Sequence, residues 1–131
     1  MARPQAARDT DMTEYRFPQR LRLLKPRDFE LVMQARASAT DGLVRMYGAA
    51  NDLNHPRLGL TVSRRVGGAT IRNTWKRALR EAFRLAQHDL PACDIVCIPH
   101  RDSAPNVARL IESLGKLSRR IDAELRRRSA R

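Results

Sequence analysis

The sequence predicts a single α+β domain in which helices pack one small sheet. Three observations point to this fold class. A chain of 131 residues has room for one modest core and too little for two. Its composition, 42% hydrophobic and 31% charged residues, is that of a chain that folds. Along the chain, helical and alternating hydrophobic periods follow one another in the order helix, strands, helix, strand, helix.

The two ends of the chain lack these periods. Residues 1–18 predict a flexible tail, residues 19–127 the folded domain, and residues 128–131 a frayed end. Asp9, Asp11 and Glu14 balance the arginines of the tail, so the net charge of +12 belongs to the folded part. No run approaches the ~18 apolar residues of a membrane span, and no apolar signal-peptide core precedes the domain. We therefore expect a cytoplasmic protein with no membrane partner.

The first half of the domain contains a helix and a strand before the central stretch. Pro26 suits the first turn of a helix, which ends near Arg36. The residues that follow Pro26 at helical spacing are Phe29, Val32 and Met33. Residues 43–47 predict a strand, and the turn-forming residues 51–56 are expected to join two antiparallel strands.

The central stretch, residues 56–84, changes from strand to helix. Residues 58–63 alternate apolar and small or polar side chains, Gly67 and Gly68 form a turn, and a helix starts at Ala69. Its apolar arc consists of Ile71, Trp75, Ala78, Leu79, Ala82, Phe83 and Ala86. The opposite side carries Asn73, Lys76, Arg77, Arg80 and Arg84, with Arg72 at the boundary.

This basic face has three possible readings. Solvated faces usually interleave Glu with Lys or Arg, whereas Glu81 stands almost alone here. A membrane surface or a peptide-binding partner also takes basic amphipathic helices, but three alanines in the apolar arc suit packing on a sheet. The pattern therefore favours a polyanionic partner, nucleic acid above all.

After the central helix the sequence predicts a buried strand and a long final helix. Cys93 and Cys97 lie in the strand, residues 93–98, and residues four apart in a strand are ~13 Å apart, too far to share a zinc ion with His100. We read them as core cysteines in a reducing compartment. Ser103 and Pro105 open the last helix. Its apolar stripe is Val107, Leu110, Ile111, Leu114, Leu117, Ile121 and Leu125, and its end is strongly basic.

Three runs in the central stretch carry a resemblance to a known family. They are Gly-Leu-Thr-Val-Ser-Arg-Arg at 59–65, Arg-Asn-Thr-Trp-Lys-Arg at 72–77 and Arg-Glu-Ala-Phe-Arg at 80–84. Together they resemble the signature of the bacterial ribonuclease P protein subunit, and the resemblance extends over about residues 20–120. Thr74 departs from it, because the family usually has a second arginine at that position.

The resemblance implies a more specific fold. It implies a four-stranded sheet in the order αβββαβα, similar to the second domain of ribosomal protein S5. It also implies a left-handed crossover between the strand at 58–63 and the strand at 93–98. Sequence reasoning alone predicts the opposite hand, because parallel βαβ units are right-handed by strong default.

The resemblance also implies a function. In this family an RNA subunit with Mg²⁺ removes the 5′ leader of precursor tRNA, so the chain would be the non-catalytic protein component of an endoribonuclease. It would bind the catalytic RNA, one chain per RNA, and grip the leader. The implied RNA contacts are Arg64, Arg65, Arg72, Asn73, Lys76, Arg77 and Arg80. The implied leader cleft has Phe29 and Met33 on one side and Tyr47 on the other, with core packing an equal alternative for the aromatic residues.

Two other functions would fit part of this pattern. A ribosomal or general structured-RNA-binding protein would share the basic helix and lack any processing role. A stand-alone nuclease would need clustered carboxylates that hold a metal, or paired histidines. His55, His88 and His100 are scattered in loops, and the acidic residues show no metal-ligand spacing. The sequence therefore predicts a binding protein with no catalytic residues and no metal site of its own.

Overall fold

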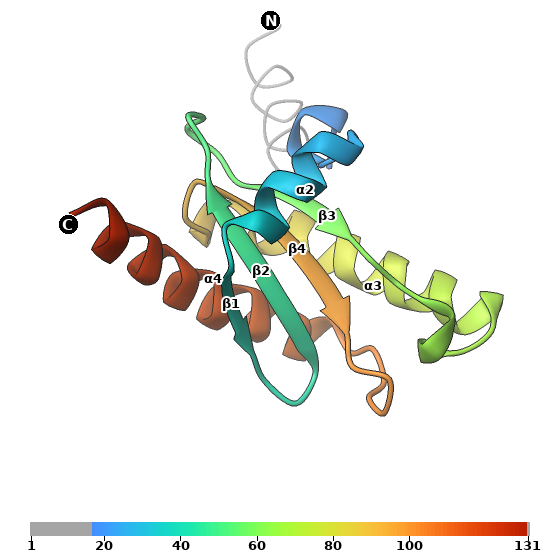
Figure 1. Ribbon diagram of the computed structural model, residues 1–131. Helices are drawn as coiled ribbons and strands as arrows, with labels where there is room; N and C mark the ends of the chain where they lie inside the picture. The colour runs from blue at the N-terminus through green and yellow to red at the C-terminus, as the bar shows by residue number, and fades with distance from the viewer. Residues whose placement is uncertain (1–16, 131) are drawn as a thin grey trace, which may run out of the picture.

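The computed structural model describes residues 17–130 and has a mixed four-stranded sheet at its centre (Figure 1). The strands are β1 Ala37–Thr40, β2 Val44–Ala50, β3 Arg57–Leu60 and β4 Cys93–Pro99. The helices are α2 Pro26–Gln34, α3 Ala69–Ala86 and α4 Val107–Ser129. Short 3₁₀ turns are η1 Gln19–Leu21, η2 Arg64–Val66 and η3 Gln87–Asp89. This is the predicted α+β class with the order αβββαβα.

The strands lie in the order β1-β2-β4-β3. β2 pairs antiparallel with both β1 and β4, and β3 pairs parallel with β4. The turn at residues 51–56 therefore joins two strands of opposite direction, as expected, but β4 lies between them. The flexible tail predicted at residues 1–18 lies outside the described residues, except for Phe17 and Pro18.

The crossover from β3 through α3 to β4 is left-handed (Figure 1). The chain leaves β3 at the edge of the sheet, crosses one face of the sheet as α3 and returns as β4, one strand further in. With the strands pointing up and α3 toward the viewer, β4 lies to the left of β3. The hand implied by the family resemblance is thus present, and the right-handed default is wrong for this chain.

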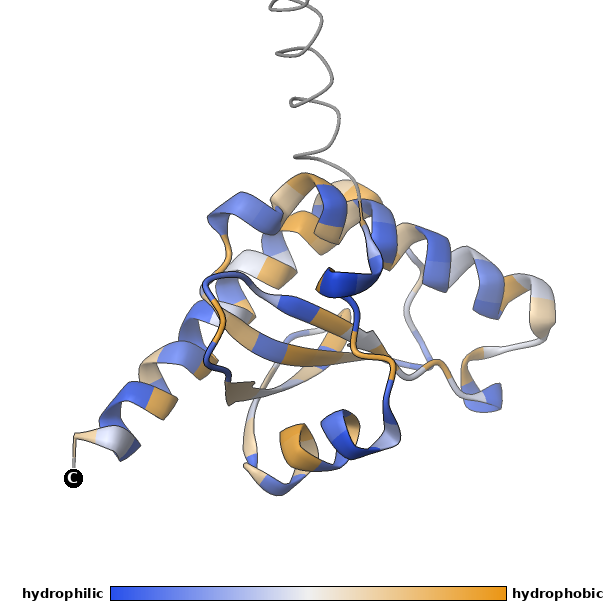
Figure 2. Ribbon diagram, turned by 90° about the horizontal axis from the view of Figure 1, so that it is seen from above, coloured by the Kyte–Doolittle hydropathy of each residue, from blue (hydrophilic) through white to orange (hydrophobic). Residues whose placement is uncertain are grey.

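The two faces of the sheet are covered unequally (Figure 2). α3 and α4 pack together over one face and enclose the main core. Its largest fully buried side chains include Trp75, Phe83, Met46, Leu58, Leu79, Ile95, Leu110, Leu114, Leu117 and Ile121. Burying each such side chain contributes up to about 1.5–3 kcal/mol, so this layer carries most of the stability.

Among residues 17–130, α2 is the only helix over the other face. Leu23, Val32 and Val96 are buried there in a smaller cluster. The residues packed against them are only partly buried, namely Phe29, Tyr47, Ala49 and Ile98. The side of the sheet beneath α2 is therefore incompletely covered.

Several predicted boundaries need correction. β3 ends at Leu60, three residues early, because the chain turns into η2 after Ser63. α2 ends at Gln34, and α4 is capped by Asn106, whose side chain accepts a hydrogen bond from the Arg109 backbone N–H. α4 runs to Ser129, two residues into the segment 128–131 that was expected to fray.

Two apolar residues also lie differently from the prediction. Ile71 is 49% exposed and covers Gly67 instead of joining the core. Phe17, placed in the tail by its sequence, packs its ring 5.1 Å from that of Phe83. The Arg22 guanidinium lies 4.6 Å above the Phe17 ring, so the folded domain extends to Phe17.

An ion pair ties the parallel strands together. Arg57 on β3 donates from Nε and Nη2 to the two carboxylate oxygens of Asp94 on β4, at 2.8 and 2.7 Å. Asn51 donates to the same carboxylate at 2.8 Å, and Asp28 of α2 lies 3.9 Å from Arg57. These hydrogen bonds raise the pKa of the Arg57 guanidinium. Arg57 therefore serves the fold, although it belongs to the basic stretch.

The two cysteines are free thiols in the core, as predicted. Burial raises the pKa of Cys93 and of Cys97 to about 12. No helix among residues 17–130 is long and apolar enough to cross a membrane.

Candidate nucleic-acid interface

α3 separates its apolar and basic side chains onto opposite faces. Trp75, Ala78, Leu79, Ala82, Phe83 and Ala86 are buried against the sheet and α4. Asn73, Arg77 and Arg80 are exposed, while Arg72 and Lys76 are half-buried at the margins. Because the core anchors the helix from Trp75 to Ala86, the side chains along this part project from a firmly seated backbone.

A shallow hollow lies on the outer face of α3. Its lining consists of Thr70, Asn73, Thr74, Lys76, Arg77 and Arg80. Four predicted RNA-contact residues thus surround one depression. The Thr74 hydroxyl donates to the Thr70 carbonyl oxygen at 2.9 Å and stays close to the helix backbone. The short side chain found where the family usually has arginine therefore helps to leave the hollow open.

The cations of this face are not neutralised within the described part of the chain. No ion pair there involves Arg64, Arg65, Arg72, Lys76, Arg77 or Arg80. Arg84 differs, because its guanidinium pairs with Glu81 at 2.7 Å and lowers the pKa of that carboxyl. The one acidic residue of α3 is thus engaged by the last arginine of the helix, and the other cations keep their full charge for a partner.

η2 places two further arginines before α3. The Ser63 side chain accepts a hydrogen bond from the Arg65 backbone N–H at 3.3 Å, which starts the turn. Gly67 then has a φ of 151°, and a Cβ at this position would lie 2.8 Å from Ile71. A glycine is required here, since other residues rarely adopt this backbone conformation. The turn leaves Arg64 and Arg65 exposed at the end of β3.

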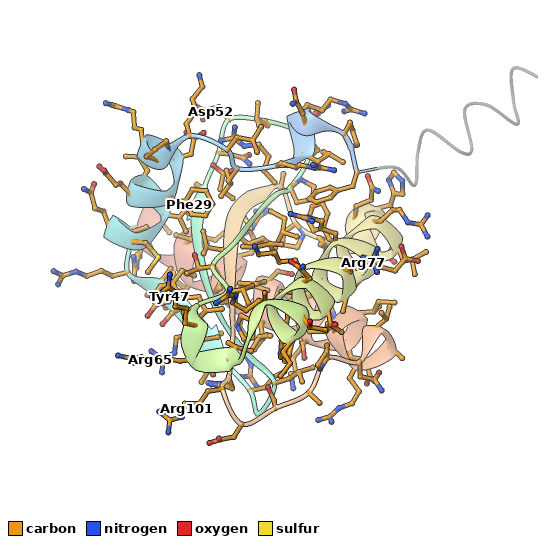
Figure 3. The ribbon with its side chains drawn as sticks, turned by 90° about the vertical axis from the view of Figure 1, so that its right-hand side faces the viewer. Phe29, Tyr47, Asp52, Arg65, Arg77 and Arg101 are labelled. Carbon is orange, nitrogen blue, oxygen red and sulfur yellow. The ribbon has the colours of Figure 1, made fainter. Side chains whose placement is uncertain are left out.

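The incompletely covered face of the sheet holds the predicted leader residues. Phe29 of α2 lies against Gly59 of β3, so closely that a Cβ on Gly59 would be 2.7 Å from the ring. Tyr47 of β2 belongs to the same cluster, and its hydroxyl accepts a hydrogen bond from Arg45 at 3.4 Å. In Figure 3, Phe29, Tyr47 and Arg65 follow one another from α2 to η2, while Arg77 lies on α3 to the right.

Met33 completes this predicted set with a different environment. It is 40% exposed on α2, whereas Phe29 and Tyr47 are half-buried. The two aromatic rings therefore combine core packing with an accessible surface. The two roles considered for them, core and contact, are compatible in this geometry.

The sequence predicted most of the residues of these two surfaces but not Thr70 and Arg45. Thr70 lines the hollow on α3, and Arg45 borders Tyr47. Thr70 lies one helical turn before Thr74, and Arg45 lies two residues before Tyr47 on the same side of a strand. These spacings were the available signals.

The described residues contain no group of three or more His, Cys, Asp or Glu side chains placed to hold a metal ion. Two histidines have local hydrogen-bond partners: His100 contacts the Thr40 hydroxyl at 2.8 Å, and His55 contacts the Pro56 carbonyl oxygen at 3.1 Å.

Comparisons with known proteins agree with this geometry. The family model "Ribonuclease P" matches residues 17–122. The ribonuclease P protein component of Proteus mirabilis is 44% identical over 111 residues, which cover 83% of this chain and 93% of the relative. Among solved structures, the RNase P protein of Thermotoga maritima is 31% identical, with a TM-score of 0.63 over 72% of this chain and 96% of that chain. A mutant of the Staphylococcus aureus RNase P protein is 28% identical, with a TM-score of 0.67 over 76% of this chain and 91% of that chain.

The match covers most of both partners in each comparison, and it includes the basic helix, the turn before it and the sheet. RNase P is an endoribonuclease of tRNA processing in which the protein is a non-catalytic subunit. The chain belongs to the bacterial ribonuclease P protein family and is the protein component of that ribonucleoprotein enzyme.

Proposed function

We propose that α3 and η2 bind the phosphate backbone of the catalytic RNA, one chain per RNA, and that the incompletely covered sheet face beneath α2 holds the 5′ leader of precursor tRNA. Cleavage then belongs to the RNA subunit with Mg²⁺, in the cytoplasm. The protein neutralises phosphates, supports the folded RNA and grips the leader. The contacts on α3 and η2 are Arg64, Arg65, Arg72, Asn73, Lys76, Arg77 and Arg80.

The uncompensated charge on one rigid helix carries this proposal. Guanidinium groups match phosphate oxygens in geometry and in charge, and each phosphate contact releases counterions. Like charges this close together repel one another on a free protein. A polyanion relieves that repulsion, so binding is strongly salt-dependent and gains from every cation of the set.

The sheet face beneath α2 suits a different kind of contact. Phe29 and Tyr47 present ring surfaces on which unpaired bases stack, and such stacking is worth ~1–3 kcal/mol per base without regard to sequence. Arg45, which donates to the Tyr47 hydroxyl, adds a cation beside these rings. A leader of any sequence could thus be held, which a general processing enzyme requires.

The first experiment tests the RNA face. Replacing Arg72 and Lys76 together by Ala removes two cations from α3 and leaves the buried face intact. At limiting Mg²⁺, the reconstituted holoenzyme should cleave precursor tRNA at least ~10-fold more slowly, since each lost phosphate contact weakens binding ~5-fold near 0.15 M salt. Excess Mg²⁺ should restore much of the rate, because divalent ions then replace the missing cations.

A matched control removes Arg109 and Arg126 from α4. This variant loses the same charge from another helix and should cleave like the unchanged protein. If the Arg72 and Lys76 variant also cleaves at the unchanged rate at low Mg²⁺, the assignment of α3 is wrong. If the protein fails to activate the bare RNA subunit at all, the chain acts on another structured RNA.

A further inference from the structure

A second basic hollow lies far from α3, between the outer edge of β1 and the C-terminal half of α4. We call it the edge hollow. Its lining consists of Arg36, Ala37, Ser38, Ala39, Arg120, Ala123, Glu124, Arg127 and Arg128. β1 is an edge strand, since it pairs only with β2 in the sheet of the described residues. α4 supplies one wall of the hollow and the β1 strand the other.

The edge hollow has an excess of three positive charges, four arginines against Glu124. Arg127 and Arg128 both donate to the Glu124 carboxylate, and these hydrogen bonds hold its pKa below the usual value. Within residues 17–130, no ion pair involves Arg36 or Arg120, and both are exposed. Two guanidinium groups are therefore available to an anion at this site.

The backbone of Arg36 gives a second, independent observation. Its φ is 55°, the sole positive value among the described residues other than glycine. Helices commonly end with glycine in this left-handed conformation, and another residue there is strained. An arginine held in such a conformation is a reason to look for a function of its side chain. That side chain lines the edge hollow.

The position of the hollow is fixed by Arg128. Its guanidinium donates to the carbonyl oxygens of Ala35 and of Arg36, the latter at 3.2 Å, and to Glu124 at 3.0 Å. The C-terminal part of α4 is thereby fastened to the segment that joins α2 to β1. The arginines of the hollow come from distant parts of the sequence and are held in place together.

The edge hollow and the basic face of α3 lie on different sides of the molecule. In Figure 1 the C-terminal end of α4 is at the left, beyond β1, and α3 is at the right, behind β3 and β4. The two basic surfaces therefore cannot contact the same few nucleotides.

We propose that the edge hollow is a second binding site for RNA phosphates, in addition to the face proposed on α3. This second site depends on the proposed function in one respect only, namely that the partner is a folded RNA. Apart from its charged residues the hollow is lined by small side chains, Ala37, Ser38, Ala39 and Ala123. An extended peptide added to β1 would gain specificity from pockets for larger side chains. A phosphate backbone needs only cations at a suitable depth.

The test uses Arg36→Gly and Arg120→Ala, separately and together, in the full-length protein. Glycine relieves the left-handed strain at position 36, so the melting temperature should stay level or rise while a cation is lost. Each variant should weaken RNA binding ~5-fold near 0.15 M salt, and the pair ~20-fold, with a smaller dependence of log K on log salt concentration. Arg109→Ala is the control, an exposed arginine of α4 outside the hollow.

Two binding arms identify which RNA supplies the phosphates. Weaker binding of the protein to the RNA subunit alone assigns the hollow to the catalytic RNA. Weaker binding of precursor tRNA by the assembled holoenzyme, with unchanged affinity for the RNA subunit, assigns it to the substrate. Either result supports the proposal.

Unchanged affinity and salt dependence in both arms, equal to those of Arg109→Ala, would overturn it. That outcome would leave the β1 edge to a peptide or to no partner. The Arg72 and Lys76 variant is measured in parallel, because a loss of binding there with none at the edge hollow refutes this inference and leaves the function of α3 intact.

Discussion

The ion pair between Arg57 and Asp94 makes a quantitative prediction about stability. Asp94→Asn keeps the side-chain shape and removes the charge, so at least one amide hydrogen then faces a donor of Arg57 or Asn51. Hydrogen bonds to charged groups contribute ~1.5–3 kcal/mol each, and breaking a fully buried pair costs ~3–5 kcal/mol. The Arg57 side chain is 24% exposed and that of Asp94 10%, which reduces the second figure. We expect a loss of about 2–3 kcal/mol.

The loss should appear as a lower melting temperature. A domain of this size unfolds with an entropy of roughly 0.24 kcal/mol per kelvin, so the midpoint should fall by about 10 °C. Circular dichroism during heating measures it, and urea titration at one temperature gives the free energy of unfolding independently. The RNA affinity of the variant, measured well below its midpoint, should be unchanged.

The control is Glu81→Gln, which breaks the exposed pair with Arg84 on α3. The two side chains are 45% and 35% exposed, and such surface pairs contribute little. Its midpoint should move by less than ~2 °C. If Asp94→Asn moves the midpoint no further than Glu81→Gln does, the pair does not hold the parallel strands together and the reasoning is refuted.

Three further changes test the site and the core. Thr74→Arg places a cation in the hollow on α3 and should raise affinity for the RNA subunit ~5-fold near 0.15 M salt in a filter-binding assay, whereas no gain would mean that the hollow contacts no RNA. Gly59→Ala puts a Cβ 2.7 Å from the present position of the Phe29 ring, so the ring must move. Precursor tRNA with a long leader should then bind the holoenzyme ~10-fold more weakly, whereas precursor tRNA with a one-nucleotide leader should bind as before. The thiols of Cys93 and Cys97, with pKa values raised to about 12, should resist alkylation in the folded protein. In the unfolded chain these thiols ionise with a pKa near 9. The free energy of unfolding should therefore fall as the pH rises above 9, by up to ~1.4 kcal/mol per thiol and pH unit. Replacing both cysteines by Ala should remove that part of the fall in melting temperature.

Most of the fold could be predicted from the sequence, because its local periods agree with its tertiary structure. The buried face of α3 matches the predicted arc except at Ile71, which is exposed and lies against Gly67. The parallel pairing of β3 with β4 follows from the predicted strand, helix, strand order. Its register, which places Arg57 opposite Asp94, has no signal in the local pattern, because the two residues lie far apart in the chain. The left hand of the crossover came from family resemblance alone.

The candidate site was predicted less evenly. The cations of α3 were found because charge and helical spacing suffice to place them on one face. The edge hollow was not, since Arg36 and Arg120 come together only through the packing of α4 against β1. The strained backbone of Arg36 likewise has no signal in the sequence.

The rigid seating of α3 limits what the protein can recognise. Arg72, Lys76 and Arg80 follow one another every four residues, about 6 Å apart along the helix axis. Cations held at this fixed spacing recognise the spacing of phosphates and make no contact that depends on the base sequence. Discrimination among RNAs must then come from three-dimensional shape, so an RNA of unrelated sequence folded to the same contour would compete for this protein.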